Sequence, residues 1–265
     1  MKNKTNIRPS WSLVGVGTAA LMSGLIATSA IAADPALMDP DADKILKEMS
    51  AYMGEISGFS ADFDVSTDII TADGQKIKLA SSGNVVVNRP GQFRIKRLGA
   101  LAEIEFILDG EQLTLYGQKI NGYVQIPATS IDAAVAKVRD DIGFEVPGAD
   151  VLSSNPFDMD VTDVVSGTHV GMTTVGGETV HHLAFRGEQV DWQVWVQDGN
   201  EPVPMKYVIT SKLVAGAPEY SLLISNWVSE PQMDDTMFTF VPPTGAQEIT
   251  AVTIDAAGNI IDKSE

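Results

Sequence analysis

The residue types best suited to acid–base or metal chemistry are the histidines, His169, His181 and His182. An imidazole titrates near neutral pH and is a common metal ligand. His181 and His182 are adjacent in a segment expected to be a strand, so their side chains should point to opposite faces of a sheet. They are therefore poorly placed to bind one ion together, and structural roles are favoured over a metal or acid–base role.

A second candidate is the closely spaced set of carboxylates Asp158, Asp160 and Asp163, whose oxygens could bind calcium. Their spacing lacks the glycine and the terminal glutamate of an EF-hand loop. Acidic loops are also common in a chain with 35 acidic and 18 basic residues. We therefore expect no metal ion and no other cofactor.

Motifs that would identify an enzyme are missing from the sequence. There is no cysteine, which excludes thiol catalysis and a disulfide framework. A Gly-x-Ser-x-Gly turn, a glycine-rich phosphate loop and a His-Glu-x-x-His pair are also lacking. We expect a protein that is not an enzyme, and a hydrolase that uses a pair of carboxylates is the weaker alternative.

The net charge of the chain is −17. Such an acidic surface repels phosphate backbones and anionic membranes. The charge therefore argues strongly against a nucleic-acid partner.

The first 32 residues are typical of a cleavable secretory signal. Lys2, Lys4 and Arg8 precede an apolar stretch, which is followed by Ala30-Ile31-Ala32. Small residues at these positions predict a cut before Ala33. A retained membrane anchor is the alternative, because the apolar stretch is nearly long enough to span a bilayer. We favour export to the periplasm, with no membrane-spanning segment left after cleavage.

Two helices and a series of strands must position the candidate residues. Apolar residues recur at helical spacing over residues 43–56 and 130–142, and Gly143 is expected to end the second helix. Residues 144–166 are expected to be mostly irregular. Apolar and polar residues alternate as in half-buried strands over residues 61–69, 77–87, 93–96, 103–108, 113–116, 179–186, 191–197, 205–212, 220–228 and 237–241.

This pattern predicts a mainly β protein of the α+β class. About ten strands would form a strongly curved antiparallel sheet, with the two helices on its concave face, because each helix and each strand has one apolar face to bury. We expect one domain over residues 33–248 and a polar C-terminal tail over residues 249–265. Such a sheet can pack solidly against its helices or enclose a cavity, and composition does not decide between these outcomes.

Several segments resemble proteins of known fold. Residues 83–93 (GNVVVNRPGQF), 108–116 (LDGEQLTLY) and 238–246 (FTFVPPTGA) are similar to segments of the periplasmic lipoprotein carrier LolA and its relatives. The segments 182–186 (HLAFR), 191–196 (DWQVWV) and 204–210 (PMKYVIT) resemble more closely a family of predicted periplasmic proteins, the domain of unknown function 2092. The resemblance covers roughly residues 42–246.

The resemblance implies an incomplete β-barrel, in which helices form a lid over a hydrophobic cavity that accepts acyl chains. In the carriers, the arginine before the proline helps to hold the lid closed through hydrogen bonds, and Arg89 occupies the matching position. One departure is Ile95, which stands where the carriers have an aromatic residue.

The candidate binding residues are Arg89, as a gate of the cavity, and a set of apolar strand residues. Without the resemblance, Arg89 would be interpreted as a solvated turn residue. The apolar set fits a close-packed core as well as a cavity lining. These cavity candidates are Val65, Val85, Phe93, Ile95, Ile104, Phe106 and Leu115.

The leading hypothesis is a non-catalytic periplasmic protein that binds a lipid or a lipid-modified polypeptide. The alternative is a sensor or interaction module of the cell envelope, with a protein partner instead of a lipid. Lipid that copurifies with the protein would distinguish the first hypothesis from the second.

Overall fold

The computed structural model describes residues 38–99, 103–143, 149–152, 164–250, 252–254 and 260–263. The expected secretory signal and its cut before Ala33 lie outside the described residues, as do Asp158, Asp160 and Asp163. Within the described ranges, no helix combines the length and the apolar character needed to cross a membrane.

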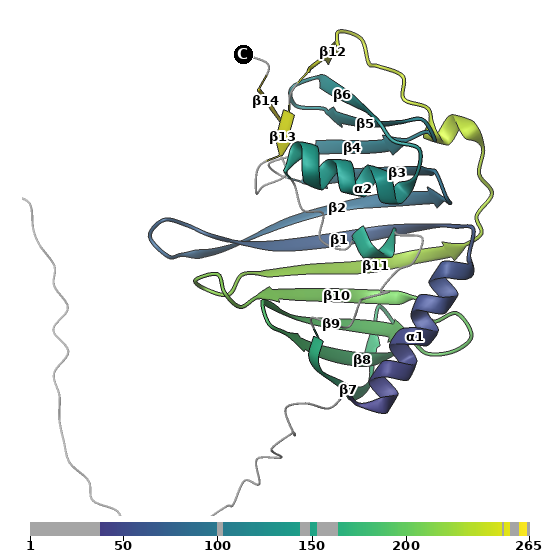
Figure 1. The fold of residues 1–265 in the computed structure, drawn as a ribbon, viewed down its shortest axis with the longest axis vertical. Coiled ribbons are helices and arrows are strands. Elements are labelled where there is room, and N and C mark those ends of the chain that lie inside the picture. The colour runs from purple at the N-terminus through teal and green to yellow at the C-terminus, as the bar shows by residue number, and fades with distance from the viewer. Residues whose placement is uncertain are drawn as a thin grey trace, which may run out of the picture. The chain divides into compact units, whose positions relative to one another are not determined.

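A single sheet of twelve strands dominates the structure (Figure 1). Its strand order is β12-β6-β5-β4-β3-β2-β1-β11-β10-β9-β8-β7. Neighbouring strands are antiparallel, except that β12 pairs with β6 in parallel. The strands are β1 (Gly58–Ile70), β2 (Lys76–Asn88), β3 (Gln92–Gly99), β4 (Glu103–Leu108), β5 (Gln112–Gly117), β6 (Gly122–Pro127), β7 (Val164–Val175), β8 (Glu178–Gly187), β9 (Val190–Gln197), β10 (Pro204–Ser211), β11 (Glu219–Ser229) and β12 (Gln247–Glu248).

Both expected helices are present, with slightly different bounds. Helix α1 spans Pro40–Glu55 and begins before residue 43, because Asp39 accepts a hydrogen bond from the backbone of Asp41 and Pro40 occupies the first turn. Helix α2 spans Ile131–Lys137 and continues as a π-helical turn, η1 (Val138–Ile142). Ser130 caps α2, and Gly143 ends η1 with a φ of 72°, as the sequence predicts.

The register of the strands defines one apolar face of the sheet, here called the inner face. Cross-strand partners lie on the same face, and one row of partners crosses β1 to β6 through Ala61, Val85, Ile95, Phe106, Leu115 and Val124. A second row crosses β1 and β11 to β8 through Val65, Leu222, Tyr207, Val194 and Leu183.

Helix α1 lies against β7, β8 and β9, and its Met49 and Met53 are fully buried in the core that the inner face supplies. Helix α2 lies across the other half of the same sheet (Figure 1). The predicted fold is therefore confirmed: a mainly β protein with a large curved antiparallel sheet and two helices.

Several strand assignments differ from those expected, among them the short strand β12, which the sequence pattern does not indicate. Strands β6 and β7 were not expected from the sequence. In β7 only Gly167 is buried, so the strand carries almost no apolar alternation that a sequence pattern could detect. The expected strand at residues 237–241 was wrong. Asp234 caps a 3-10 turn, η4 (Asp235–Phe238), which buries Phe238.

The segment expected to be a polar tail is not polar throughout. It forms a second, two-stranded sheet from β13 (Val252–Ile254) and β14 (Ile260–Asp262). Ile254 and Ile260 are buried and belong to the hydrophobic core. The hydroxyl of Thr253 donates to the carbonyl oxygen of Ile142, over 3.2 Å. The described strands of this segment therefore pack against the end of η1, and the division of the chain at residue 248 stays a prediction.

Candidate functional site

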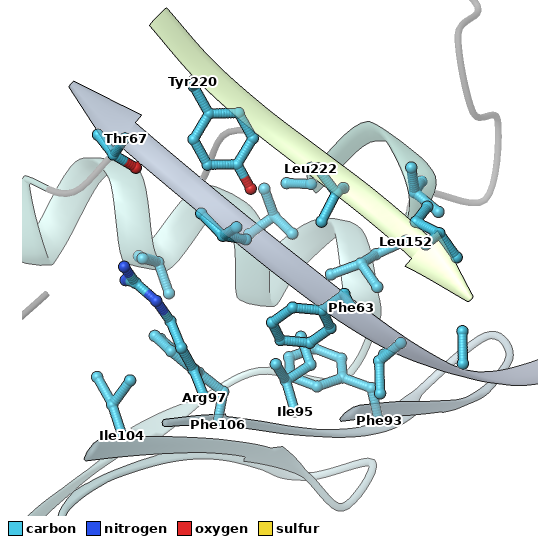
Figure 2. Close-up of a pocket in the computed structure, with 18 of the residues that line it drawn as sticks. Phe63, Thr67, Phe93, Ile95, Arg97, Ile104, Phe106, Leu152, Tyr220 and Leu222 are labelled. Carbon is cyan, nitrogen blue, oxygen red and sulfur yellow. The ribbon is translucent and has the colours of Figure 1, made fainter. Parts of the chain in front are cut away.

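A cavity of about 370 Å³ lies between the inner face of the sheet and the segment that contains α2. Its size falls within the range of about 300–1,000 Å³ that is usual for small-molecule sites. Most side chains around it are apolar, as Figure 2 shows for residues of β1, β3, β4 and β11. The apolar lining consists of Phe59, Ala61, Phe63, Val65, Val85, Phe93, Ile95, Ile104, Phe106, Ala134, Val135, Val138, Ala149, Val151, Leu152, Pro218, Leu222, Ile224, Trp227 and Ile254.

Most of the apolar strand residues singled out in the sequence lie on this cavity. They share the inner face because they alternate along β1 to β4 with residues of the opposite face. Their contact with a ligand stays a prediction. The residues concerned are Val65, Val85, Phe93, Ile95, Ile104 and Phe106.

Leu115 has a different position. It is the cross-strand partner of Phe106 on the inner face, but it is fully buried and lies outside the cavity lining. Its environment is that of a core residue, so the interpretation as ordinary core fits Leu115 better than the interpretation as cavity wall.

The two helices contribute differently to the cavity. Val135 of α2 and Val138 of η1 line it. In contrast, Met49 and Met53 of α1 are completely buried and lie outside the lining. The cavity is therefore a feature of the α2 half of the sheet.

Arg89 connects three segments near the cavity. Its Nη1 donates to the carbonyl oxygen of Ile56, at the end of α1, over 3.0 Å. Its Nη2 donates to the carbonyl oxygen of Val151 over 3.4 Å, and its guanidinium lies 5.7 Å from the ring centre of Phe59. The carbonyl oxygen of the next residue, Pro90, accepts from the first amide of α2, Ile131, over 3.0 Å.

Arg89 is therefore not a solvated turn residue, although it lies outside the lining itself. Burial lowers the pKa of its guanidinium, and the nearby carboxylate of Asp132 opposes this shift. Because Val151 lines the cavity, the side chain of Arg89 ties one part of the wall to the end of α1. This position is compatible with a gate, and that role stays a prediction.

One end of the cavity is polar, which was not expected from the sequence. Figure 2 shows Arg97, Thr67 and Tyr220 at this end, with Phe63, Phe93 and Leu152 farther along the cavity. Period-two alternation could have found Arg97, because it follows Phe93 and Ile95 at successive even spacings on β3.

The histidines lie away from the cavity lining. Nδ1 of His181 is 3.2 Å from Nε2 of His169, and Nε2 of His181 is 3.1 Å from Oδ1 of Asp198. His182 instead stacks on Trp195 and contacts Gln193 over 2.9 Å. Among the described residues, no group of three or more histidine or acidic side chains could hold a metal ion.

A family model described as "Predicted periplasmic protein (DUF2092)" matches residues 42–252. The chain belongs to this family. The resemblance to this family, noted at residues 182–186, 191–196 and 204–210, is thereby confirmed. No curated protein matches the chain in sequence.

Solved structures provide more distant comparisons. An uncharacterized conserved protein from Thermus thermophilus is 12% identical with a TM-score of 0.47, covering 79% of this chain and 98% of that one. A LolA superfamily protein from Nitrosomonas europaea is 12% identical with a TM-score of 0.38, covering 75% and 97%. A chain of the Pseudomonas aeruginosa MucA/MucB complex is 12% identical with a TM-score of 0.41, covering 83% and 63%.

Proposed function

We propose that this protein is a non-catalytic periplasmic binding protein, which holds an acyl chain of a lipid or of a lipid-modified polypeptide in its cavity. The observation that carries the proposal is the cavity of about 370 Å³ with its largely apolar wall. Protein interiors are normally packed without voids much larger than a water molecule. A space of this size between a sheet and a helix is therefore better suited to a ligand than to core packing.

The chemistry of the wall favours a hydrocarbon. Aromatic and aliphatic side chains from β1, β2, β3, β4, β11 and β13, together with α2 and η1, surround the space. Apolar cavities of proteins accept apolar molecules in preference to water. Each acyl CH₂ group that leaves water for such a site contributes about 0.8 kcal/mol. Burial of an acyl chain of several carbons is therefore sufficient for useful affinity. Such binding requires no catalytic group.

Two observations support a periplasmic location for this protein. The family description names a predicted periplasmic protein, and Ala30-Ile31-Ala32 predicts a cut before Ala33. N-terminal sequencing of the protein from its native host should therefore begin at Ala33 or within one or two residues of it. Recovery of intact Met1 from a membrane fraction would contradict cleavage.

The first test of lipid binding is mass spectrometry of organic extracts from protein purified from its native host. We expect an acyl-containing compound in stoichiometric amount. A lipid-free protein that instead copurifies with an envelope protein would favour the alternative of an interaction module.

A second test blocks the cavity. Ile104 and Val135 face the cavity from opposite walls, the sheet and α2. Ile104→Trp or Val135→Trp should abolish binding of the fluorescent probe N-phenyl-1-naphthylamine while the circular dichroism spectrum remains that of the wild type. Val170→Trp is the matched control, because Val170 is 57% exposed on β7. Unchanged probe binding in both cavity variants would refute binding in this cavity.

A further inference from the structure

Arg97 places a charged group at the wall of a mostly apolar cavity. It shares the inner face of β3 with Phe93 and Ile95, and its cross-strand partner on β2 is Gly83. Because Gly83 has no side chain, the ring of Phe63 lies over it, and any Cβ there would be only 2.5 Å from that ring. The space above Gly83 is therefore available to the side chains of Phe63 and Arg97.

The guanidinium of Arg97 has little compensation from the protein. Its Nε donates to the hydroxyl of Ser81 over 2.8 Å. Among the described residues, no carboxylate forms an ion pair with it, and no other hydrogen bond to its side chain is formed. Burial lowers the pKa of Arg97, with a partly opposing effect from Tyr220. Arg97 is partly buried, and partial burial of a cation without a counter-charge is unfavourable, so an anion that bound there would relieve this cost.

Two hydroxyl groups accompany Arg97 at this end. Thr67 of β1 and Tyr220 of β11 are cross-strand partners, and both line the cavity. Burial raises the pKa of Tyr220 to about 12, so its hydroxyl remains a hydrogen-bond donor at neutral pH. Within the described part of the chain, neither side-chain hydroxyl has a hydrogen-bond partner. Figure 2 shows both on the same side of the cavity as the guanidinium.

The two acidic residues nearby do not neutralise Arg97. Asp68 is paired with Lys78 over 2.8 Å and with Lys76 over 3.6 Å, and it also accepts from the backbone of Glu219 over 3.1 Å. Glu219 is exposed and contacts the hydroxyl of Thr210 over 3.4 Å. The lysines balance the charge of Asp68, which leaves Arg97 as the cation that faces the cavity.

We infer that Arg97, Thr67 and Tyr220 bind the anionic head of an amphiphile, a carboxylate or a phosphate, whose acyl chain occupies the apolar part of the cavity. This inference rests on the proposed function. A guanidinium presents several N–H donors in a plane and matches the oxygens of both head groups. The hydroxyls of Thr67 and Tyr220 supply further donors at the same end of the cavity.

The test compares ligands that differ only in the head. Dodecanoate, dodecyl phosphate and dodecanol are each used to displace N-phenyl-1-naphthylamine, an uncharged probe, from the purified mature protein. We expect at least one of the two anions to bind about tenfold or more tightly than dodecanol. The reason is that a charged head forms stronger hydrogen bonds with the guanidinium than a neutral hydroxyl does. The tighter of the two anions identifies the head as a carboxylate or a phosphate.

Variants of β3 then assign the preference to Arg97. Arg97→Met should reduce the preference for the anion to about twofold or less, without changing the affinity for dodecanol, and Arg97→Lys should retain part of it. Arg94→Met is the matched control, since Arg94 lies on the opposite face of the same strand and pairs with Glu105. It should keep the preference of the wild type.

The outcomes separate this inference from the proposed function. Equal binding of the anions and dodecanol by the wild type, or an unchanged preference in Arg97→Met, overturns the role of Arg97 while acyl binding stands. If no dodecyl compound displaces the probe and the native extract contains no lipid, the proposed function fails, and the inference fails with it.

Discussion

The side chain of Arg89 donates a hydrogen bond to the carbonyl oxygen of Val151, with 3.4 Å between Nη2 and the oxygen. Val151 lines the cavity, whereas Arg89 does not. The same guanidinium also holds the carbonyl oxygen of Ile56 at the end of α1. One arginine thus links the cavity wall to a helix that does not itself contact the cavity.

The first prediction concerns this link. Arg89→Leu should lower the free energy of unfolding by about 1–3 kcal/mol, because two carbonyl oxygens lose a charged donor. It should also speed ligand release, since residues 149–152 lose their tie to α1. As the gate that the family resemblance implies, Arg89 is expected to affect release, and a solvated arginine would have little effect on stability. The structure adds the loss of stability, because Arg89 is partly buried and bonded.

Urea unfolding and stopped-flow release of the bound probe measure these two effects. Arg186→Leu is the control, because Arg186 is exposed on β8, and its stability should change by less than about 0.5 kcal/mol. Equal release rates from the two variants would show that Arg89 does not hold the wall.

The strands around the cavity were predictable because their alternation is strong. In β3 and β4, residues such as Phe93, Ile95, Ile104 and Phe106 alternate with charged residues, so the sequence indicates both the strand and the face. Strand β7 lacks this signal, and its place at the edge of the sheet depends on pairing with β8. Pairing between distant segments cannot be read from a local pattern.

The polar end of the cavity illustrates a different limit. The pattern of β3 places Arg97 on the apolar face, but a charged residue near a strand end is usually solvated. Only the pairing of β1 with β11, which brings Thr67 beside Tyr220, indicates that a polar cluster is formed. Whether apolar residues form a core or line a cavity also depends on how distant segments pack, as Leu115 and Ile95 demonstrate.

The second prediction compares these two residues, which lie in the same cross-strand row. Leu115→Ala should lower the free energy of unfolding by about 2–5 kcal/mol, because it leaves a hole in a close-packed core. Ile95→Ala should cost less, since Ile95 is only partly buried and already borders a space. Ile95→Ala should instead alter probe affinity, which Leu115→Ala should leave unchanged. Urea unfolding and probe titration of both variants check this, and the reverse pattern would place Leu115 in the cavity wall.

The third prediction concerns the pH dependence of stability. Burial raises the pKa of Tyr220 to about 12, whereas an unfolded tyrosine titrates near pH 10. The stability that this shift contributes is fully present below about pH 10 and is lost as the pH rises through about 12.

Tyr220→Phe removes the titrating group and should therefore lose less stability than the wild type between about pH 9 and 12. The measurement is the urea midpoint of both proteins across this range. Tyr123→Phe is the control, because the Tyr123 ring packs beside Phe240, away from the cavity. A wild type that loses no more stability than Tyr220→Phe would contradict the burial of this hydroxyl.

The fourth prediction tests whether the C-terminal strands belong to the cavity. Ile254 of β13 is 7% exposed and lines the cavity, and its neighbour Thr253 donates to the carbonyl oxygen of Ile142 at the end of η1. Ile254→Ala should lower the free energy of unfolding by about 1–3 kcal/mol through lost apolar burial. It should also weaken probe binding, because it removes part of the wall. Ile261→Ala is the matched control in the paired strand, since Ile261 is 43% exposed, and it should change both quantities little. If the two variants have equal stability and equal probe affinity, the C-terminal strands do not form part of the binding site.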